Sequence, residues 1–330
     1  MQFFLGLDLA KDTFVALLID ERGTVLQQRS FPNSAAGFDE LLDWLPNSQQ
    51  TLALCEPTGV YGKRLQHALA SRLGSLHELN AQTLRRFSFS QVQTKTDQAD
   101  ALSIAQAARM LFLSRPEILE KSRVQPNLTR EDLALWLNEC DRLRDAIARL
   151  RNQIAGLEHS PAPTAGEVKQ RRHQELQRLL LERKEVIRKI QELYRQLNDQ
   201  DAACIDSIPG VGPLTTAAAL VAIRDIRRFD SADALKAYLG TYPARRQSGL
   251  RERPAHVARH GNRLLRHMLW NAARAAVWHQ HPQNPFRKLF DHLRAKGKTY
   301  GQAIGAVVRK LVQVIYGVLK TKTHFQYPAS

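Results

Sequence analysis

The chain has 330 residues, and its 48 lysines and arginines against 32 aspartates and glutamates give a formal net charge of +16. A hydrophobic content of 43% supports folded cores and excludes wholesale disorder. Three widely spaced cysteines exclude a disulfide framework or a cysteine-based zinc site. No apolar run approaches the roughly 18 residues of a membrane span, and we expect no signal peptide at the start. We therefore expect a cytoplasmic protein of about two domains with no membrane partner.

The positive charge is concentrated in the last third of the chain. Residues 1–120 carry 11 basic and 13 acidic side chains, a net charge of −2, and residues 121–200 carry 16 and 12, a net charge of +4. Residues 201–330 carry 21 and 7, a net charge of +14. This asymmetry favours a surface that binds a polyanion, most often nucleic acid, over a basic surface that serves solubility alone.

The first 125 residues predict an α/β domain. Apolar and β-branched runs bounded by turn residues predict strands, and apolar residues at helical spacing predict helices between them. The order β-β-β-α-β-α-β-α is that of a ribonuclease H-like domain. The predicted strands are 3–8, 13–19, 24–31, 51–55 and 75–79. One predicted helix begins after Ser34, and two more cover residues 61–73 and 99–113.

Residues 126–200 predict a helical hairpin. Two stretches carry apolar residues at alternating spacings of three and four, which is the heptad pattern of a coiled coil. A proline-containing segment separates them, and Arg183 interrupts the second. Both helices are highly charged off the seam, which favours a protruding antiparallel hairpin, or arms that pair with another chain, over two helices packed on their own domain. The seam residues are Trp136, Cys140, Leu143, Ile147, Leu150, Ile154 and Leu157, then Leu176, Leu180, Ile187, Ile190, Tyr194 and Leu197.

Residues 201–330 predict a mostly α-helical domain that ends in a helix over 300–320. The segment Ile208-Pro209-Gly210-Val211-Gly212, before an apolar helix at 214–223, fits the turn of a helix-hairpin-helix element. Gly210 and Gly212 would let backbone amides approach a DNA phosphate without reading sequence. The alternative is a glycine-rich turn with no ligand.

Four acidic residues fall where a ribonuclease H-like sheet would bring them together. Asp8 ends the first strand, Glu56 ends the fourth, and Asp97 and Asp100 share one face at the start of a helix. Four carboxylates crowded together need cations to stay ionised, and hard oxygen ligands favour Mg²⁺ or Mn²⁺. Each acid alone has an ordinary structural explanation. The ordered set of four predicts a two-metal site for chemistry at phosphorus.

Ser248 lies in the most basic stretch of the chain. Arg245, Arg246, Arg251 and Arg253 surround it. One interpretation is a nucleophilic hydroxyl whose target phosphate is held by the arginines. The other is a phosphate-binding loop in which Ser248 only donates a hydrogen bond, and the local composition by itself favours this second interpretation.

Taken together, these segments resemble the insertion sequence 110 (IS110) family of transposases, to which the pilin-gene DNA invertases are similar. The resemblance covers almost the whole chain in the right order, which makes it more specific than any single motif. The segments that carry it are Gly6–Lys11, Glu56–Gly59, Lys95–Ala101, Pro209–Gly212, Leu239–Pro243, Arg246–Gly249 and the helix Leu311–Lys320.

The resemblance implies three domains and a covalent mechanism. Residues 1–125 would form a RuvC-like domain that binds Mg²⁺ through the four acids, 126–200 a coiled coil, and 201–330 a transposase domain. Ser248 would be the nucleophile, linking covalently to DNA. The family implies an RNA-guided recombinase that joins donor and target DNA with an element-encoded bridge RNA. It also implies a tetramer with shared active sites, associated with the nucleoid of a prokaryotic cell.

Other interpretations remain open at this point. A site-specific DNA invertase would act without a guide RNA. A Holliday-junction-type nuclease would use the four acids and a metal-bound water, and Ser248 would be incidental. A sugar kinase of the actin-like fold does not explain the C-terminal charge, and a non-catalytic nucleic-acid-binding protein does not explain the ordered acids.

Overall fold

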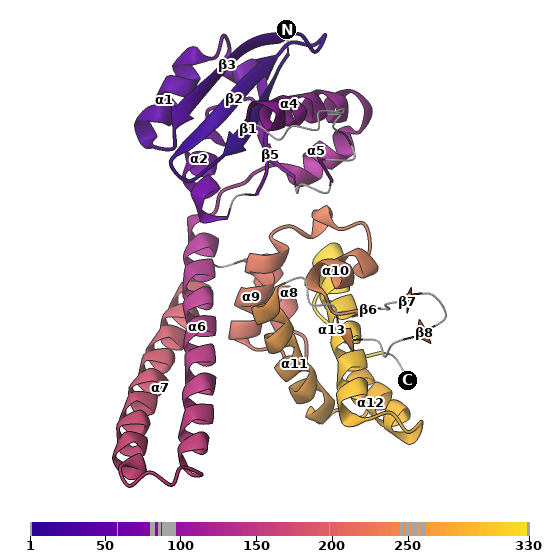
Figure 1. Ribbon diagram of the computed structural model, residues 1–330. Coiled ribbons are helices and arrows are strands. Elements are labelled where there is room, and N and C mark those ends of the chain that lie inside the picture. Colours follow the sequence, from indigo (N-terminus) through magenta and orange to yellow (C-terminus); the bar gives the residue numbers. More distant parts are fainter. Residues whose placement is uncertain are drawn as a thin grey trace. The chain divides into compact units, whose positions relative to one another are not determined.

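The chain folds into two compact units, Met1–Pro126 and Asn127–Ser330, in the computed structural model (Figure 1). We describe each unit by itself. The structure describes residues 2–57, 59–79, 83–84, 87, 97–197, 199–244, 247–248, 251–252, 256–257 and 262–328.

Unit 1 is built on a mixed five-stranded sheet in the order β3-β2-β1-β4-β5. The first three strands form an antiparallel meander, and β4 and β5 continue from β1 in parallel. The predicted α/β character and all five predicted strands are confirmed. The strands are β1 (Phe3–Leu9), β2 (Thr13–Ile19), β3 (Val25–Pro32), β4 (Thr51–Cys55) and β5 (Ser75–Glu78). The helices are α1 (Ala35–Trp44), α2 (Val60–Leu69), α4 (Asp97–Ser114) and α5 (Pro116–Ser122), with a short 3₁₀ turn, η1 (Ser48–Gln50).

The sheet is covered on both faces, which explains why β1 is apolar at nearly every position. Alternate residues such as Leu5 and Leu7 pack with α1 and α2 in one hydrophobic cluster. The residues between them, such as Phe4, pack with α4 in a second cluster. Gly6 points at α4, where a Cβ atom would lie 2.0 Å from the Ala101 carbonyl oxygen. The glycine is therefore what allows α4 to lie directly on β1.

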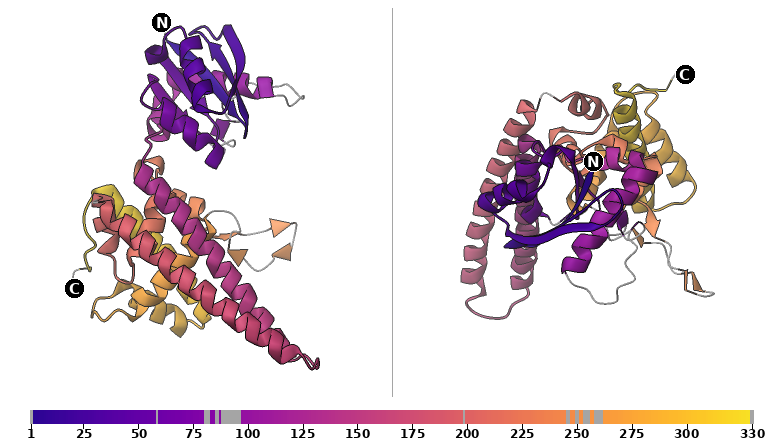
Figure 2. Two further views of the ribbon diagram at one scale, coloured as in Figure 1. Left: turned by 90° about the vertical axis from the view of Figure 1, so that its left-hand side faces the viewer. Right: turned by 90° about the horizontal axis from the view of Figure 1, so that it is seen from above.

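Unit 2 is mostly α-helical, as predicted. Its first two helices form a long antiparallel hairpin that the two views in Figure 2 show side by side. The helices are α6 (Leu128–Leu157), α7 (Ala165–Gln196), α8 (Gln200–Asp206), α9 (Pro213–Ile223), α10 (Ala232–Leu239), α11 (Arg263–Trp278), α12 (Pro285–Ala295) and α13 (Tyr300–Thr321), with a 3₁₀ turn, η2 (Ile226–Arg228). The strands are β6 (Pro243–Ala244), β7 (Gln247–Ser248), β8 (Arg251–Glu252) and β9 (His256–Val257).

The buried seam of the hairpin follows the predicted positions on α6 from Cys140 to Ile154, and on α7 the most deeply buried residues lie beside most of the predicted ones. Buried α6 residues run from Leu133 to Ile154 through the predicted heptad positions, whereas Trp136 is 37% exposed. The α7 seam follows spacings of four and three only when Arg183 is counted as a seam position, beside the Cys140 thiol. Ile190 belongs to the predicted and the observed seam, and the other predicted α7 positions, such as Leu180 and Ile187, are partly buried against the same core. The α7 residues on the seam are Leu179, Arg183, Val186, Ile190 and Leu193.

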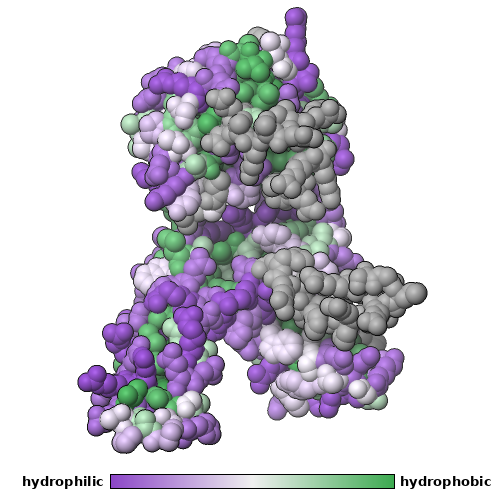
Figure 3. Space-filling view, viewed as in Figure 1, coloured by the Kyte–Doolittle hydropathy of each residue, from purple (hydrophilic) through white to green (hydrophobic). Residues whose placement is uncertain are grey.

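The hairpin and the C-terminal helices share one hydrophobic core. Buried residues of α6 and α7 belong to the same cluster as those of α8, α9, α11 and α13, and α9 contacts both hairpin helices. The outer surface of the hairpin, at the lower left of Figure 3, is mainly hydrophilic. The shared core makes 127–330 one compact unit, and the division into domains 126–200 and 201–330 stays a prediction.

Helix α13 corrects the expectation that no apolar run reaches the length of a membrane span. Its apolar window has a mean hydropathy of 1.3, and in the described part of the chain it alone is long and apolar enough to cross a bilayer. Half of that window is buried within the fold, including Ile304, Leu311 and Ile315. A core helix of this kind meets the same criteria, so the helix is weak evidence for a membrane span.

Candidate metal and nucleic-acid sites

Strand register places two of the four predicted acids side by side. Leu7 of β1 and Cys55 of β4 are partners in the parallel ladder, and Asp8 and Glu56 each follow by one residue. Neighbouring strands lie about 4.8 Å apart, so the two acidic residues are adjacent at the carboxyl edge of the sheet. Leu7 and Cys55 face the cluster under α2. Because side chains alternate along a strand, Asp8 and Glu56 belong to the opposite face, which α4 covers.

The start of α4 lies over the same edge of the sheet. Ala101 and Ala105 contact Gly6, which places the preceding turn of α4 toward Asp8. Asp100 occupies that turn and is half-buried, as are Asp8 and Glu56. The side chain of Asp97 lies outside the described residues. The fold thus brings the backbone positions of the four predicted acids to one edge from β1, β4 and α4.

The metal site stays a prediction, because the described side chains do not form a set of metal ligands. Among the side chains that the structure describes, no group of three His, Cys, Asp or Glu residues is arranged to hold a metal ion. Asp97 is not among them, so the complete set of four is untested. The residue types nevertheless fit a hard divalent cation, since Asp8, Glu56 and Asp100 are half-buried carboxylates that offer only oxygen donors.

A polar network that the sequence did not indicate lies behind this edge, on the α2 face. Gln66 of α2 donates from Nε2 to the Glu78 carboxylate at the end of β5, at 2.5 Å, and lies 4.0 Å from the Cys55 sulfur. Burial, together with the Glu78 charge, raises the pKa of the Cys55 thiol to about 12. Cys55 is therefore a protonated core residue and not a nucleophile. No local sequence signal marks this network, because it depends on the β4–β5 register that pairs Cys55 with Glu78.

His77, next to Glu78 on β5, is a second buried polar residue of unit 1. Its Nδ1 lies 2.9 Å from the Leu119 carbonyl oxygen in the middle of α5 and 3.3 Å from the hydroxyl of Ser122, the last residue of that helix. Burial lowers the pKa of His77 to about 4, so the ring is neutral near pH 7. A neutral ring that donates from Nδ1 to Leu119 ties α5 to the edge of the sheet.

Ser248 lies in the inner pair of two nested strand pairs. It is the backbone partner of Arg251 across β7 and β8, and the outer pair β6–β9 joins Ala244 to His256. Figure 1 draws β7 and β8 away from the helices of unit 2. The side chain of Ser248 lies outside the described residues, as do those of Arg245, Arg246, Arg251 and Arg253. The structure describes only the backbone partnership, and the nucleophile stays a prediction.

The predicted glycine turn lies between α8 and α9, where its two glycines have different surroundings. Gly210 has a φ of +80°, and a Cβ there would lie 2.3 Å from the Ala276 amide nitrogen of α11. Packing against α11 therefore explains why a glycine occupies position 210. Gly212 caps the start of α9, and a Cβ there would meet no atom within 4 Å. Open space at a helix N-terminus suits a phosphate, so DNA binding by the turn remains a prediction that concerns Gly212 more than Gly210.

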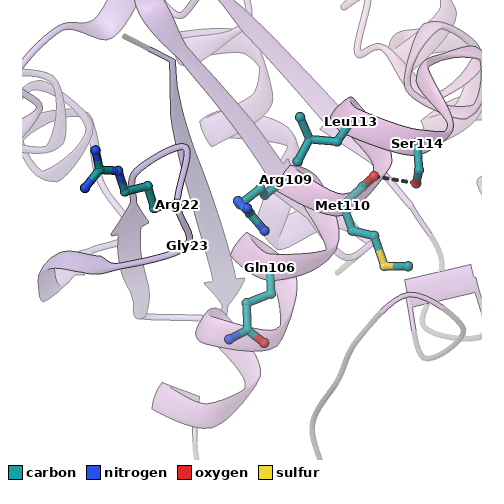
Figure 4. A pocket seen from close by; sticks show the side chains of 7 residues that line it. All are labelled: Arg22, Gly23, Gln106, Arg109, Met110, Leu113 and Ser114. Atoms are coloured by element: carbon teal, nitrogen blue, oxygen red, sulfur yellow. Dashed lines mark hydrogen bonds between the residues drawn. The ribbon is translucent and has the colours of Figure 1, made fainter.

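A shallow pocket of about 490 Å³ lies at the other end of α4 (Figure 4). Arg109 lies against the β2–β3 turn and donates from Nε to the Glu21 carbonyl oxygen at 2.6 Å. Nine residues separate Arg109 from Asp100, which is about 13 Å along a helix. The pocket is therefore separate from the acidic edge. Its lining residues are Arg22, Gly23, Gln106, Arg109, Met110, Leu113 and Ser114.

Comparison with known proteins identifies the family of the chain. Residues 5–157 match the DEDD transposase family of IS110. Residues 202–288 match the transposase family described as IS116/IS110/IS902. The chain belongs to the IS110 family of transposases. It is therefore an enzyme of DNA transposition and recombination, and its DEDD domain indicates dependence on a divalent metal.

Relatives of known name match along most of the chain. A pilin gene-inverting protein from Moraxella bovis is 27% identical over 98% of this chain and 97% of its own length. The transposase of insertion sequence element IS1111A from Coxiella burnetii is 24% identical over 96% of this chain and 89% of its own. A probable family 20 transposase from Pseudomonas aeruginosa is 26% identical over 83% of both chains. The similarity therefore spans both units.

The two glycines of the α8–α9 turn should respond differently to a methyl group. Gly210→Ala forces a positive φ on alanine and drives its Cβ into the α11 backbone, so we expect a loss of at least about 2 kcal/mol in unfolding free energy. Gly212→Ala, the matched control, should cost less than about 1 kcal/mol. Chemical denaturation of both variants measures this, and equal costs would contradict the packing role of Gly210.

The buried His77 should make the protein less stable as the pH is lowered below 7. Its pKa of about 4 in the fold lies below the unfolded value of 6.5, so the unfolded chain binds the extra proton between those values. From pH 7 to 4.5, this group should remove about 2 kcal/mol of unfolding free energy.

His77→Asn keeps a hydrogen-bond donor without a titrating group, so thermal unfolding should depend less on pH in this variant than in the wild type. An identical pH dependence in the two proteins would show that His77 is not held neutral.

Proposed function

We propose that this transposase is an RNA-guided DNA recombinase that cuts and rejoins donor and target DNA through a covalent serine–DNA intermediate, assisted by Mg²⁺. The observation that carries the proposal is the acidic edge of unit 1. There the β1–β4 register makes Asp8 and Glu56 neighbours, and the packing of α4 on Gly6 brings Asp100 to the same edge.

The topology of unit 1 supports a ribonuclease H-like, RuvC-like domain. An antiparallel meander of β3, β2 and β1 continues through two parallel strands, with helices on both faces. In that arrangement, the carboxyl ends of β1 and β4 and the start of the last long helix form the catalytic edge. In this chain Asp8 and Glu56 lie near the carboxyl ends of β1 and β4, and Asp97 and Asp100 near the start of α4, which supports assigning the same role to them.

We propose that these four carboxylates hold Mg²⁺, or Mn²⁺ in its place. When bound, the cations balance the carboxylate charge and stabilise the negative charge that develops on the phosphate oxygens. The half-buried position of Asp8, Glu56 and Asp100 fits this task, because partial burial weakens the competition from water while leaving room for DNA.

In the proposed reaction the Ser248 hydroxyl oxygen attacks the scissile phosphorus. A new phosphoester bond to serine forms as the bond to the departing deoxyribose oxygen breaks, and the serine proton balances the charge of that oxygen. The hydroxyl group of an incoming strand reverses the step and releases Ser248. The nearby arginines Arg245, Arg246, Arg251 and Arg253 hold the phosphate.

The remaining proposals concern assembly. Unit 2 carries all of the excess positive charge, which supports contacts with donor DNA, target DNA and a guide RNA encoded by the element. The hairpin α6–α7 supports pairing between subunits in a tetramer, so that the acids of one subunit act with the serine of another. We place the enzyme at the nucleoid of a prokaryotic cell.

A DNA invertase without a guide RNA is the second candidate function. The full-length similarity to a pilin gene-inverting protein favours it. RNA that co-purifies with the protein separates the two functions. One abundant structured RNA encoded beside the gene supports guidance, and its absence favours the invertase.

The covalent mechanism predicts that Ser248→Ala abolishes strand cleavage while DNA binding stays within about twofold of the wild type. Incubation with radiolabelled substrate DNA, followed by denaturing electrophoresis, should show a protein–DNA adduct only when Ser248 is present. Cleavage at the wild-type rate by Ser248→Ala, without an adduct, would instead indicate hydrolysis by a junction nuclease.

The acidic edge predicts that Asp8→Asn lowers cleavage by at least about 100-fold, because one metal-binding carboxylate is lost while size and shape are kept. Asp20→Asn is a matched control, since Asp20 caps the β2–β3 turn at the other end of β2. Cleavage rates should be measured at several Mg²⁺ concentrations. Equal rates for Asp8→Asn and the wild type would remove the acidic edge from the mechanism.

A further inference from the structure

Two exposed aromatic side chains of unit 2 contact α12, the helix labelled in Figure 1. Trp278 ends α11 with 60% of its surface exposed, and Tyr300 begins α13 with 42% exposed. Both contact the buried Phe290 of α12, with ring centroids 6.5 Å and 5.6 Å away. Three helices thus hold two exposed rings against one core residue. We call Trp278, Phe290 and Tyr300 the aromatic row.

A strongly basic segment, 285–300, contains Phe290 and Tyr300 and contacts Trp278. Between 285 and 300, five lysines and arginines stand against one acidic residue, Asp291. The Arg287 guanidinium lies 4.5 Å from the centroid of the Trp278 ring and also pairs with Asp291 at 2.7 Å. A contact of this kind fixes the indole beside a cation. The five basic residues are Arg287, Lys288, Arg294, Lys296 and Lys298.

This combination suits one class of ligand. Large exposed aromatic side chains on a soluble protein mark a binding surface when they are held together rather than scattered. Positive charge beside them selects a polyanion, and flat rings offer stacking to bases that are not paired. A duplex keeps its bases stacked on one another and offers mainly its phosphates.

We propose that the aromatic row is a stacking site for unpaired bases of a single-stranded nucleic acid, with the basic segment 285–300 holding its phosphates. The inference deepens the proposed nucleic-acid binding by unit 2 and rests on it. It places single-strand recognition on the α11–α12–α13 end of the unit, on residues that play no part in the proposed cleavage chemistry.

The test is binding of fluorescent 12-nucleotide single strands, of RNA and of DNA with one sequence, and of the matching 12-base-pair DNA duplex. Fluorescence anisotropy at one fixed salt concentration gives each dissociation constant. Trp278→Leu keeps an apolar side chain without a ring. It should weaken binding of at least one single strand by roughly 5- to 100-fold and leave duplex binding within twofold. The strand that loses more identifies the natural ligand as RNA or DNA.

Three variants complete the test. Trp278→Phe restores a ring and should recover most of the affinity, and Tyr300→Ala tests the other ring independently. Trp136→Leu is the matched control, because Trp136 is a partly exposed tryptophan on α6 with an acidic surrounding, and it should change nothing. Circular dichroism checks that each variant is folded.

Unchanged single-strand binding in both Trp278→Leu and Tyr300→Ala would overturn the inference, as would an equal loss for single strands and duplex. A change of oligomeric state with unchanged binding would assign the aromatic row to a protein contact instead. Ser248→Ala in the same assay separates the two proposals, because failure of the cleavage mechanism leaves these binding constants untouched.

Discussion

The close approach of α4 to β1 is the constraint on which the proposed chemistry depends. At Gly6 the two elements are so near that an added methyl group would lie 2.0 Å from a backbone oxygen of α4. This contact sets both the height and the direction of the helix over the sheet. Asp100 then lies over the edge where Asp8 and Glu56 end their strands. A larger residue at position 6 would lift α4 and separate its acids from those of the sheet.

In unit 2 a glycine likewise allows two backbone segments to approach closely. Gly210 brings the α8–α9 turn against the backbone of α11, and the strand segment that carries Ser248 lies between α10 and α11 in the sequence. The hairpin is joined to this assembly by the shared core, and also by pairs of Arg263 at the start of α11 with Asp141 and Asp145 of α6. The helix that follows the serine segment is thus anchored to the arm proposed to pair subunits.

Much of unit 1 could be predicted from its sequence because its signals are local. Apolar runs bounded by turns predicted all five strands, and the position of Asp8 and Glu56 at strand ends predicted that their backbones are neighbours. The network of Cys55, Gln66 and Glu78 could not be predicted, since it depends on the β4–β5 register and on which helix covers that face. The exact placement of the four acid side chains is likewise not a local property.

Unit 2 was harder to predict because its decisive contacts are distant in sequence. Gly210 suggested a phosphate contact, yet its nearest neighbours belong to Ala276, 66 residues later. Arg183 suggested a break in the α7 seam, yet it occupies a seam position beside Cys140. Arg309 and Lys310 interrupt the apolar sequence of α13, so no uninterrupted apolar run marked this helix. The aromatic row could not be predicted because its three residues come from three separate helices.

The most direct test of the central claim is a crystal structure of the protein grown with Mn²⁺ and measured at the manganese absorption edge. The account predicts anomalous density at the carboxyl edge of the sheet, coordinated by Asp8, Glu56 and acids at the start of α4. Anomalous density only elsewhere, or none at saturating Mn²⁺, would contradict the assignment of this edge as the metal site.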